Sequence, residues 1–114
     1  MNDTPPPSKT ASRNRDAVPS DETRRHHRAD LIRRAKLVRT HGWPPFRHSW
    51  SDRELAGVAL VLDDNTIITE VAGTQSTALD TWATNLWGIN AGNEDSSIGH
   101  PRTHGWFAAI RTAT

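Results

Sequence analysis

The chain has 114 residues, 34% of them hydrophobic, and it contains no cysteine. This length excludes two ordinary domains, and the composition excludes disulfides and thiolate metal sites. The formal net charge is +1, but residues 1–50 carry 11 basic and 5 acidic side chains whereas residues 51–114 carry 3 and 8, so the first half suits either a polyanionic partner or the acidic half of the same chain.

Residues 1–19 are rich in Pro, Ser, Thr, Asn and Arg and lack aromatic or paired aliphatic side chains. Such a segment cannot bury enough apolar surface to offset its ordering entropy, so we predict a disordered basic arm followed by one domain over residues 20–114. The first ten residues have no apolar stretch typical of a secretory signal, and the longest apolar run, residues 55–62, is too short to cross a bilayer. We therefore expect a cytoplasmic protein that does not engage membranes.

A first helix is predicted over residues 21–40. Ser20 precedes it as a suitable N-cap, and Gly42 follows its basic last turn as a suitable left-handed end. Its apolar residues recur at helical spacing and form a narrow stripe. The stripe consists of Leu31, Ala35 and Val38.

The prolines of the next segment, residues 43–50, favour an extended connection.

Residues 51–63 open with Ser51 and Glu54 at the spacing of a capping box, followed by a run of apolar residues. A rival interpretation pairs V-A-L-V-L with T-I-I-T-E-V across D-D-N as a β-hairpin over about residues 56–72, which would give an α+β fold. The capping box favours the helix. On that view Asp64 or Asn65 caps a second, short helix that ends at Gly73.

The clearest helical pattern covers residues 76–88, where Trp82 lies on the apolar stripe and Trp87 lies one position off it. We expect Trp82 in the core and Trp87 half-buried. Residues 90–99 are polar and predict a loop or a single turn. Pro101 suits the first position of a last helix. The predicted fold is all-α, a small orthogonal bundle of four or five short helices with a disordered N-terminal arm, in which helices 51–63 and 76–88 pack at the centre.

The pentapeptide R-T-H-G-W occurs twice, at residues 39–43 and 102–106. The first copy coincides with the predicted end of a helix, and the second with the start or interior of another. The residues around the copies share no longer period. We therefore predict two unrelated uses of the same residues.

Histidine offers the strongest case for catalysis or metal binding, because H-P-R-T-H places two imidazoles four residues apart. However, His100 precedes a proline, which favours extended backbone at His100 and would place its ring away from the helix face that carries His104. No glutamate lies between the two histidines to complete a zinc-protease motif. Nucleophile elbows and Gly-rich phosphate loops are also missing. We predict no metal, no cofactor and no catalytic residue, with a metal-dependent hydrolase as the enzymatic alternative. The histidines whose convergence the sequence leaves open are His41, His48, His100 and His104.

Binding is therefore the expected function. One hypothesis is a small regulatory or adaptor protein that engages a protein partner through its basic first helix and the Trp/Pro-rich connection, by Trp43, Phe46 and Trp50. Clamping this connection to the body is nevertheless the favoured interpretation of the two tryptophans. The alternative is DNA or RNA, bound through phosphates by the arm and first helix with little sequence selectivity. The candidate binding residues on that helix are Arg24, Arg25, Arg28, Arg33, Arg34, Lys36 and Arg39.

The charges on the first helix are not predicted to form one clean stripe. Arg24 and Arg28 lie in line with the apolar residues, whereas Arg33 and Arg34 are expected to point elsewhere. A DNA-binding helix-turn-helix over residues 52–72 is also rejected. Its second helix would be apolar and acidic, and DNA phosphates would repel the acidic side chain.

Overall fold

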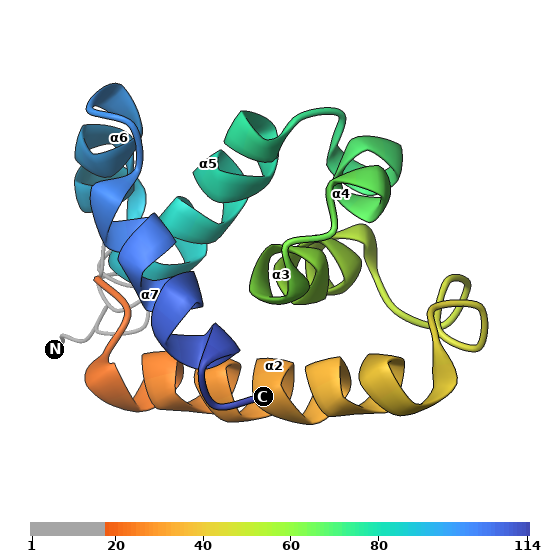
Figure 1. Cartoon of the computed structure of the whole chain (residues 1–114). Coiled ribbons are helices and arrows are strands. Elements are labelled where there is room, and N and C mark those ends of the chain that lie inside the picture. Colours follow the sequence, from red (N-terminus) through yellow and green to blue (C-terminus); the bar gives the residue numbers. More distant parts are fainter. Residues whose placement is uncertain (1–17) are drawn as a thin grey trace, which may run out of the picture.

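The computed structural model describes residues 18–114, and within this range it contains six helices and no strand (Figure 1). The all-α prediction is confirmed, although there are six helices instead of the expected four or five, because a helix forms where a loop was expected at residues 90–99. The alternative β-hairpin over residues 56–72 is wrong. The predicted arm over residues 1–19 lies almost wholly outside the described residues. The helices are α2 (Asp21–His41), α3 (Asp52–Leu62), α4 (Asn65–Ala72), α5 (Gln75–Trp87), α6 (Ile89–Ser97) and α7 (Pro101–Arg111).

The helices begin where the sequence places capping side chains. Ser51 accepts from the amide of Glu54 at 3.1 Å while the Glu54 carboxylate accepts from the amide of Ser51 at 2.9 Å, so the predicted capping box is formed. Asp64 accepts from the amide of Ile67 at 3.2 Å and starts α4. These two caps explain why the apolar run folds as two helices rather than paired strands. Ser20 caps α2 in the same way, by accepting from Thr23.

The expected loop at residues 90–99 is wrong, because most of it forms α6. This helix folds back on α5, and the backbones approach closely where Gly92 faces α5: a Cβ at this position would lie 3.0 Å from the carbonyl of Ala83. Gly92 and Asp95 are the buried residues of α6. Tertiary contact therefore decides the conformation of a segment whose own composition favours a loop.

Helix α3 forms the centre of the molecule and contacts α2, α4, α5 and α7. All seven residues from Leu55 to Val61 are buried. Trp82 of α5 is buried as predicted, and its indole N–H donates to the carbonyl of Arg53 at 3.1 Å. Helix α2 runs along one side of this centre, and α7 descends from α6 to meet it (Figure 1). No helix of residues 18–114 is long and apolar enough to cross a membrane.

Candidate functional site

Two arginines of α2 are used inside the fold. Arg34 donates to Asp30 at 2.7 Å and to Glu54 of α3 at 3.1 Å, and its side chain is only 13% exposed. The expectation that Arg34 points away from the packed face is therefore wrong. Arg24 donates to the carbonyls of Pro19 and Leu86 at 2.8 and 2.9 Å and pairs with Asp21. Part of the basic charge is thus satisfied within the chain.

Four other basic side chains of α2 lie in one row along the helix, while Arg24, Arg33 and Arg34 lie off it, so the charges of the whole helix form no single clean stripe, as expected. Arg25, Arg28, Lys36 and Arg39 are exposed and fall within a sector of about 80° on the helix, over an axial length of about 20 Å. We call these four residues the basic stripe. Within residues 18–114 they form no ion pair, and the one side-chain hydrogen bond among them joins Arg39 to Thr114 at 3.4 Å. Arg33 is exposed but pairs with Asp30.

Arginines neutralise two of the three carboxylates of α2, Asp21 and Asp30, while the exposed Glu22 lies 3.8 Å from His26. Burial acts to raise the pKa of Asp30, but hydrogen bonds from Arg34 and Arg33, together with their charges, outweigh it and lower the pKa. A hydrogen bond and the charge of Arg24 lower the pKa of Asp21. Both groups are therefore anions at neutral pH, each held by an arginine, and neither neutralises a stripe residue through an ion pair.

A pocket lies at the N-terminal end of the basic stripe. It has a volume of about 240 Å³, and both α2 and two tryptophans of other helices line it. The lining residues are Asp21, Arg24, Arg25, Arg28, Trp87 and Trp106. We call this the Trp–Arg pocket. Its position joins three of the predicted binding arginines to aromatic side chains that lie more than 50 residues away in the sequence.

Trp87 is 8% exposed, so the expectation that it is half-buried is wrong. Guanidinium groups cover its ring: Arg102 lies 4.0 Å from the ring centroid and Arg24 lies 5.3 Å from it. Its indole N–H donates to the hydroxyl of Thr103 at 3.1 Å. Trp106, by contrast, is half-buried and packs on Trp82 with ring centroids 6.4 Å apart.

The Trp/Pro-rich connection is clamped to the body, as favoured from the sequence. Trp43 donates its indole N–H to Asp64 at 2.9 Å, and Phe46 stacks on Trp50 with centroids 4.4 Å apart. Arg34 covers Trp50 at 4.8 Å. The expected extended backbone is wrong, because residues 44–49 form turns that bring Phe46 and Trp50 together. The three aromatic side chains are half-buried against the core, which reduces the surface they offer to a partner.

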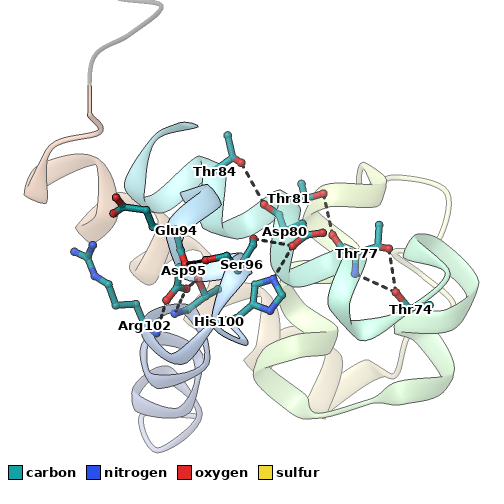
Figure 2. Close-up of polar contacts among 12 residues, drawn as sticks. Thr74, Thr77, Asp80, Thr81, Thr84, Glu94, Asp95, Ser96, His100 and Arg102 are labelled. Carbon is teal, nitrogen blue, oxygen red and sulfur yellow. Dashed lines mark hydrogen bonds and ion pairs between the residues drawn. The ribbon is translucent and has the colours of Figure 1, made fainter. Parts of the chain in front are cut away.

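A polar network joins α5 to the junction between α6 and α7 (Figure 2). Oδ1 of Asp80 lies 2.6 Å from Nε2 of His100 and accepts from the hydroxyl of Ser96 at 2.8 Å. These hydrogen bonds, first from His100 and then from Ser96, lower the pKa of Asp80. The arrangement differs from a catalytic triad, because Ser96 contacts the carboxylate instead of the imidazole. Its evident effect is to fasten the three helices together.

Asp95 of α6 organises the start of α7. Its carboxylate accepts from the backbone amides of Arg102 and Thr103 at 2.9 and 3.0 Å and from the Thr103 hydroxyl at 2.6 Å. Burial acts to raise the pKa of Asp95, but the Thr103 hydroxyl and the two amides outweigh it and lower the pKa. Asp95 therefore caps α7 from a neighbouring helix, whereas the adjoining His100 supplies no side-chain cap.

The histidines do not converge. His100 adopts left-handed backbone with a φ of 61°, so the predicted extended geometry is wrong; its amide donates to the carbonyl of Asp95 at 2.7 Å and its ring is held by Asp80. The rings of His100 and His104 have centroids 6.4 Å apart, while His41, the last residue of α2, packs on Phe46. In residues 18–114, no group of three or more His, Asp or Glu side chains could hold a metal ion.

The sequence predicts the basic side of the Trp–Arg pocket but not its aromatic side. No local pattern relates α2 to Trp87 or Trp106, since their proximity arises from how α5 and α7 pack. Asp95 was missed for a similar reason: its hydrogen bonds span seven and eight residues, and their geometry requires that α6 be helical. The exposure of Arg25 and Lys36 follows from their positions on a helical wheel, but that of Arg28, which was expected in line with the apolar residues, does not.

No family model matches this chain, and comparison with curated proteins and with solved structures gives no match either. The function must therefore be inferred from the geometry of the site.

Proposed function

We propose that the chain binds nucleic acid and that the basic stripe of α2 contacts the phosphates. The observation that carries this proposal is the lack of ion pairs at these four residues within residues 18–114, although the same helix pairs three other arginines. Exposed Arg and Lys side chains that meet phosphates release condensed counterions, which favours binding.

Nucleic acid fits the stripe better than an acidic protein segment does. Arginine provides three of its four side chains, and the planar guanidinium matches phosphate oxygens in a bidentate geometry. A row of charges about 20 Å long suits a linear polyanion with regularly spaced charges. Phosphate contacts position a protein without reading bases, so we expect little sequence selectivity. The proposed activity is binding without catalysis.

The adaptor hypothesis, in which Trp43, Phe46 and Trp50 engage a protein partner, stays a prediction with less support. Each of these side chains is half-buried and packs against the core. A partner would meet only part of each aromatic side chain, whereas all four residues of the basic stripe are exposed. Binding hot spots are usually aromatic side chains that enter a partner's pocket, which a clamped side chain does less readily.

The test compares two double variants that remove the same charge from different surfaces. Arg25→Gln with Arg28→Gln alters the stripe, and Arg33→Gln with Arg53→Gln alters exposed arginines outside it. Fluorescence anisotropy of labelled DNA and RNA oligonucleotides over a range of salt concentrations gives the affinity and its salt dependence. We expect the stripe variant to bind more weakly and its log–log salt slope to fall in magnitude by about 1.4 to 1.8. The control variant should keep the wild-type slope.

Equal weakening by the two double variants would mean that only overall charge matters, and the stripe would lose its role. If wild-type protein binds neither DNA nor RNA at low salt, nucleic-acid binding is excluded. The adaptor hypothesis would then be tested directly, by photocrosslinking from the Trp/Pro-rich connection.

A further inference from the structure

The Trp–Arg pocket is large enough for one chemical group and too small for a whole cofactor. Its volume of about 240 Å³ lies below the range of roughly 300 to 1,000 Å³ that is typical of pockets for drug-sized ligands. It opens beside the basic stripe and shares Arg25 and Arg28 with it. A ligand that follows the stripe would therefore place one of its groups in this pocket.

The two tryptophans of the pocket differ in what they can offer. Trp87 is nearly covered, since Arg102 and Arg24 lie over its ring and Thr103 accepts from its indole N–H. Trp106 is half-buried and makes its internal contacts with Trp82 and Phe107. Trp106 thus provides the aromatic surface against which a ligand can stack, and Trp87 forms a fixed wall.

The charges of the pocket are arranged for an anion beside this aromatic surface. Arg25 and Arg28 are exposed and, within the described part of the chain, take part in no ion pair. The acidic lining residue, Asp21, is paired with Arg24, which is itself anchored to the carbonyl of Leu86. Three arginines and one aspartate give the lining a formal charge of +2. The pocket therefore combines an aromatic surface with two arginines that are free to meet phosphate.

We infer that the preferred ligand is single-stranded nucleic acid, with one unpaired base stacked on Trp106 and the adjoining phosphates on Arg25 and Arg28. This inference rests on the proposed function and narrows it. Every base has a π-face, so stacking on an aromatic side chain tolerates any sequence and suits strands whose bases are not paired. A duplex holds its bases inside and would have to expel one, at a cost in stacking and pairing energy, before the pocket could be filled.

The first test uses unaltered protein and two ligands with the same backbone charge. A short oligothymidylate is compared with an oligomer of equal length that carries abasic sugars throughout, by competition in the anisotropy assay. We expect the abasic strand to bind between about 5-fold and 150-fold more weakly, as the loss of one stacked base predicts. A duplex of the same length should also bind more weakly than the single strand.

The outcomes separate the inference from the function on which it rests. Equal affinity for the two single strands, or tighter binding of the duplex, would overturn the base pocket and leave phosphate binding intact. Failure of every nucleic acid to bind would overturn both. These results do not depend on whether any variant folds.

A variant pair then locates the stacking residue. Trp106→Leu removes the proposed platform, and Trp43→Leu removes a half-buried tryptophan at the same position of the other R-T-H-G-W copy. Trp106→Leu should bind the oligothymidylate and the abasic strand equally while keeping its salt slope, whereas Trp43→Leu should still discriminate between them. Far-ultraviolet circular dichroism checks that each variant is folded. Retained discrimination in folded Trp106→Leu would contradict the assignment of the platform.

Discussion

The two copies of R-T-H-G-W have identical side chains and different structures. In the first copy, α2 ends at His41, Gly42 has a φ of 77°, and Trp43 reaches across to Asp64. The second copy lies wholly within α7, where Gly105 is helical and Thr103 is completely buried. The same five residues therefore end one helix and form the first half of another.

The position of proline explains the difference. Pro44 and Pro45 follow the first copy. Proline disfavours helical backbone in the residue before it, and inside a helix it lacks the N–H for a backbone hydrogen bond and clashes with the preceding turn. Pro101 precedes the second copy and occupies the first helical position, where its missing N–H costs nothing. A short motif thus takes its conformation from the residues that flank it, and matched substitutions in the two copies should have different effects.

The largest difference is expected at threonine. Thr103→Val should lower the free energy of unfolding by about 3 kcal/mol, because the buried indole N–H of Trp87 loses its acceptor and Asp95 loses a charge-assisted hydrogen bond. Thr40→Val should change it by less than about 0.5 kcal/mol, since Thr40 is exposed. Denaturant unfolding followed by circular dichroism measures both.

Valine matches threonine in shape and helix propensity, so the comparison isolates the hydroxyl group. If the two valine variants lose the same stability, the hydrogen bonds of Thr103 do not distinguish the copies and this account of α7 is wrong.

Acid should weaken the surroundings of the second copy through Asp95. Its pKa is lowered in the folded chain, so its contribution to stability is present above the unfolded pKa of about 3.9 and is lost as the pH falls through the folded pKa. Asp95→Asn should cost about 2 kcal/mol at neutral pH by weakening the hydrogen bonds to the start of α7. The difference in stability from wild type should shrink below about pH 4. Urea unfolding at a series of pH values measures it.

Glu94→Gln is the matched control, because Glu94 is exposed and its carboxylate accepts no hydrogen bond within the described part of the chain. Its unfolding free energy should follow that of wild type from neutral pH into acid. His27, whose pKa is lowered mainly by burial and then by Arg53, also favours the folded state less in acid. It is present in all three proteins, so it does not affect the comparison. A constant difference for Asp95→Asn down to strong acid would contradict the prediction.

The glycines should respond with opposite signs. Gly42→Ala places a side chain on backbone with a φ of 77° and should cost about 1 to 2 kcal/mol. Gly105→Ala lies inside α7, where an added Cβ meets no atom within 4 Å, and should stabilise by about 0.5 to 1 kcal/mol through helix propensity. Thermal unfolding should therefore move the two melting temperatures in opposite directions. Two shifts of the same sign would show that the copies differ less than their backbones indicate.

The substituted residues and their neighbours show which features of the fold could be predicted from the sequence alone. Ser51, Asp64 and Pro101 act locally, through hydrogen bonds or backbone limits within one turn, and each was placed correctly at the start of a helix. Asp95 and Thr103 could not be paired, because both lie on helices whose packing no local pattern predicts.

The candidate site follows the same division. The exposure of Arg25 could be predicted from its position on α2, whereas Arg28, expected in line with the apolar residues, is exposed. The internal role of Arg34 depends on Glu54 and Trp50, which only the docking of α3 brings near. Trp106 becomes a candidate platform only because α7 packs beside α2. Binding residues on the surface of a single helix could therefore be predicted from the sequence, whereas contacts that join side chains of different helices could not.

The smallest effect on stability is expected at the arginines of the two copies, Arg39 and Arg102. The variant that loses more stability should lose less nucleic-acid affinity. Arg102→Gln removes a guanidinium 4.0 Å from the Trp87 ring and should cost about 0.5 to 1 kcal/mol. Arg39→Gln removes an exposed side chain with one long hydrogen bond and should stay within about 0.5 kcal/mol of wild type. Nucleic-acid affinity should fall more for Arg39→Gln, because Arg39 belongs to the basic stripe whereas the Arg102 guanidinium is engaged with Trp87. Denaturant unfolding and fluorescence anisotropy, measured on the same two variants, should therefore rank them in opposite orders. If one variant lowers both the unfolding free energy and the nucleic-acid affinity more than the other does, stability and binding are not divided between the two copies.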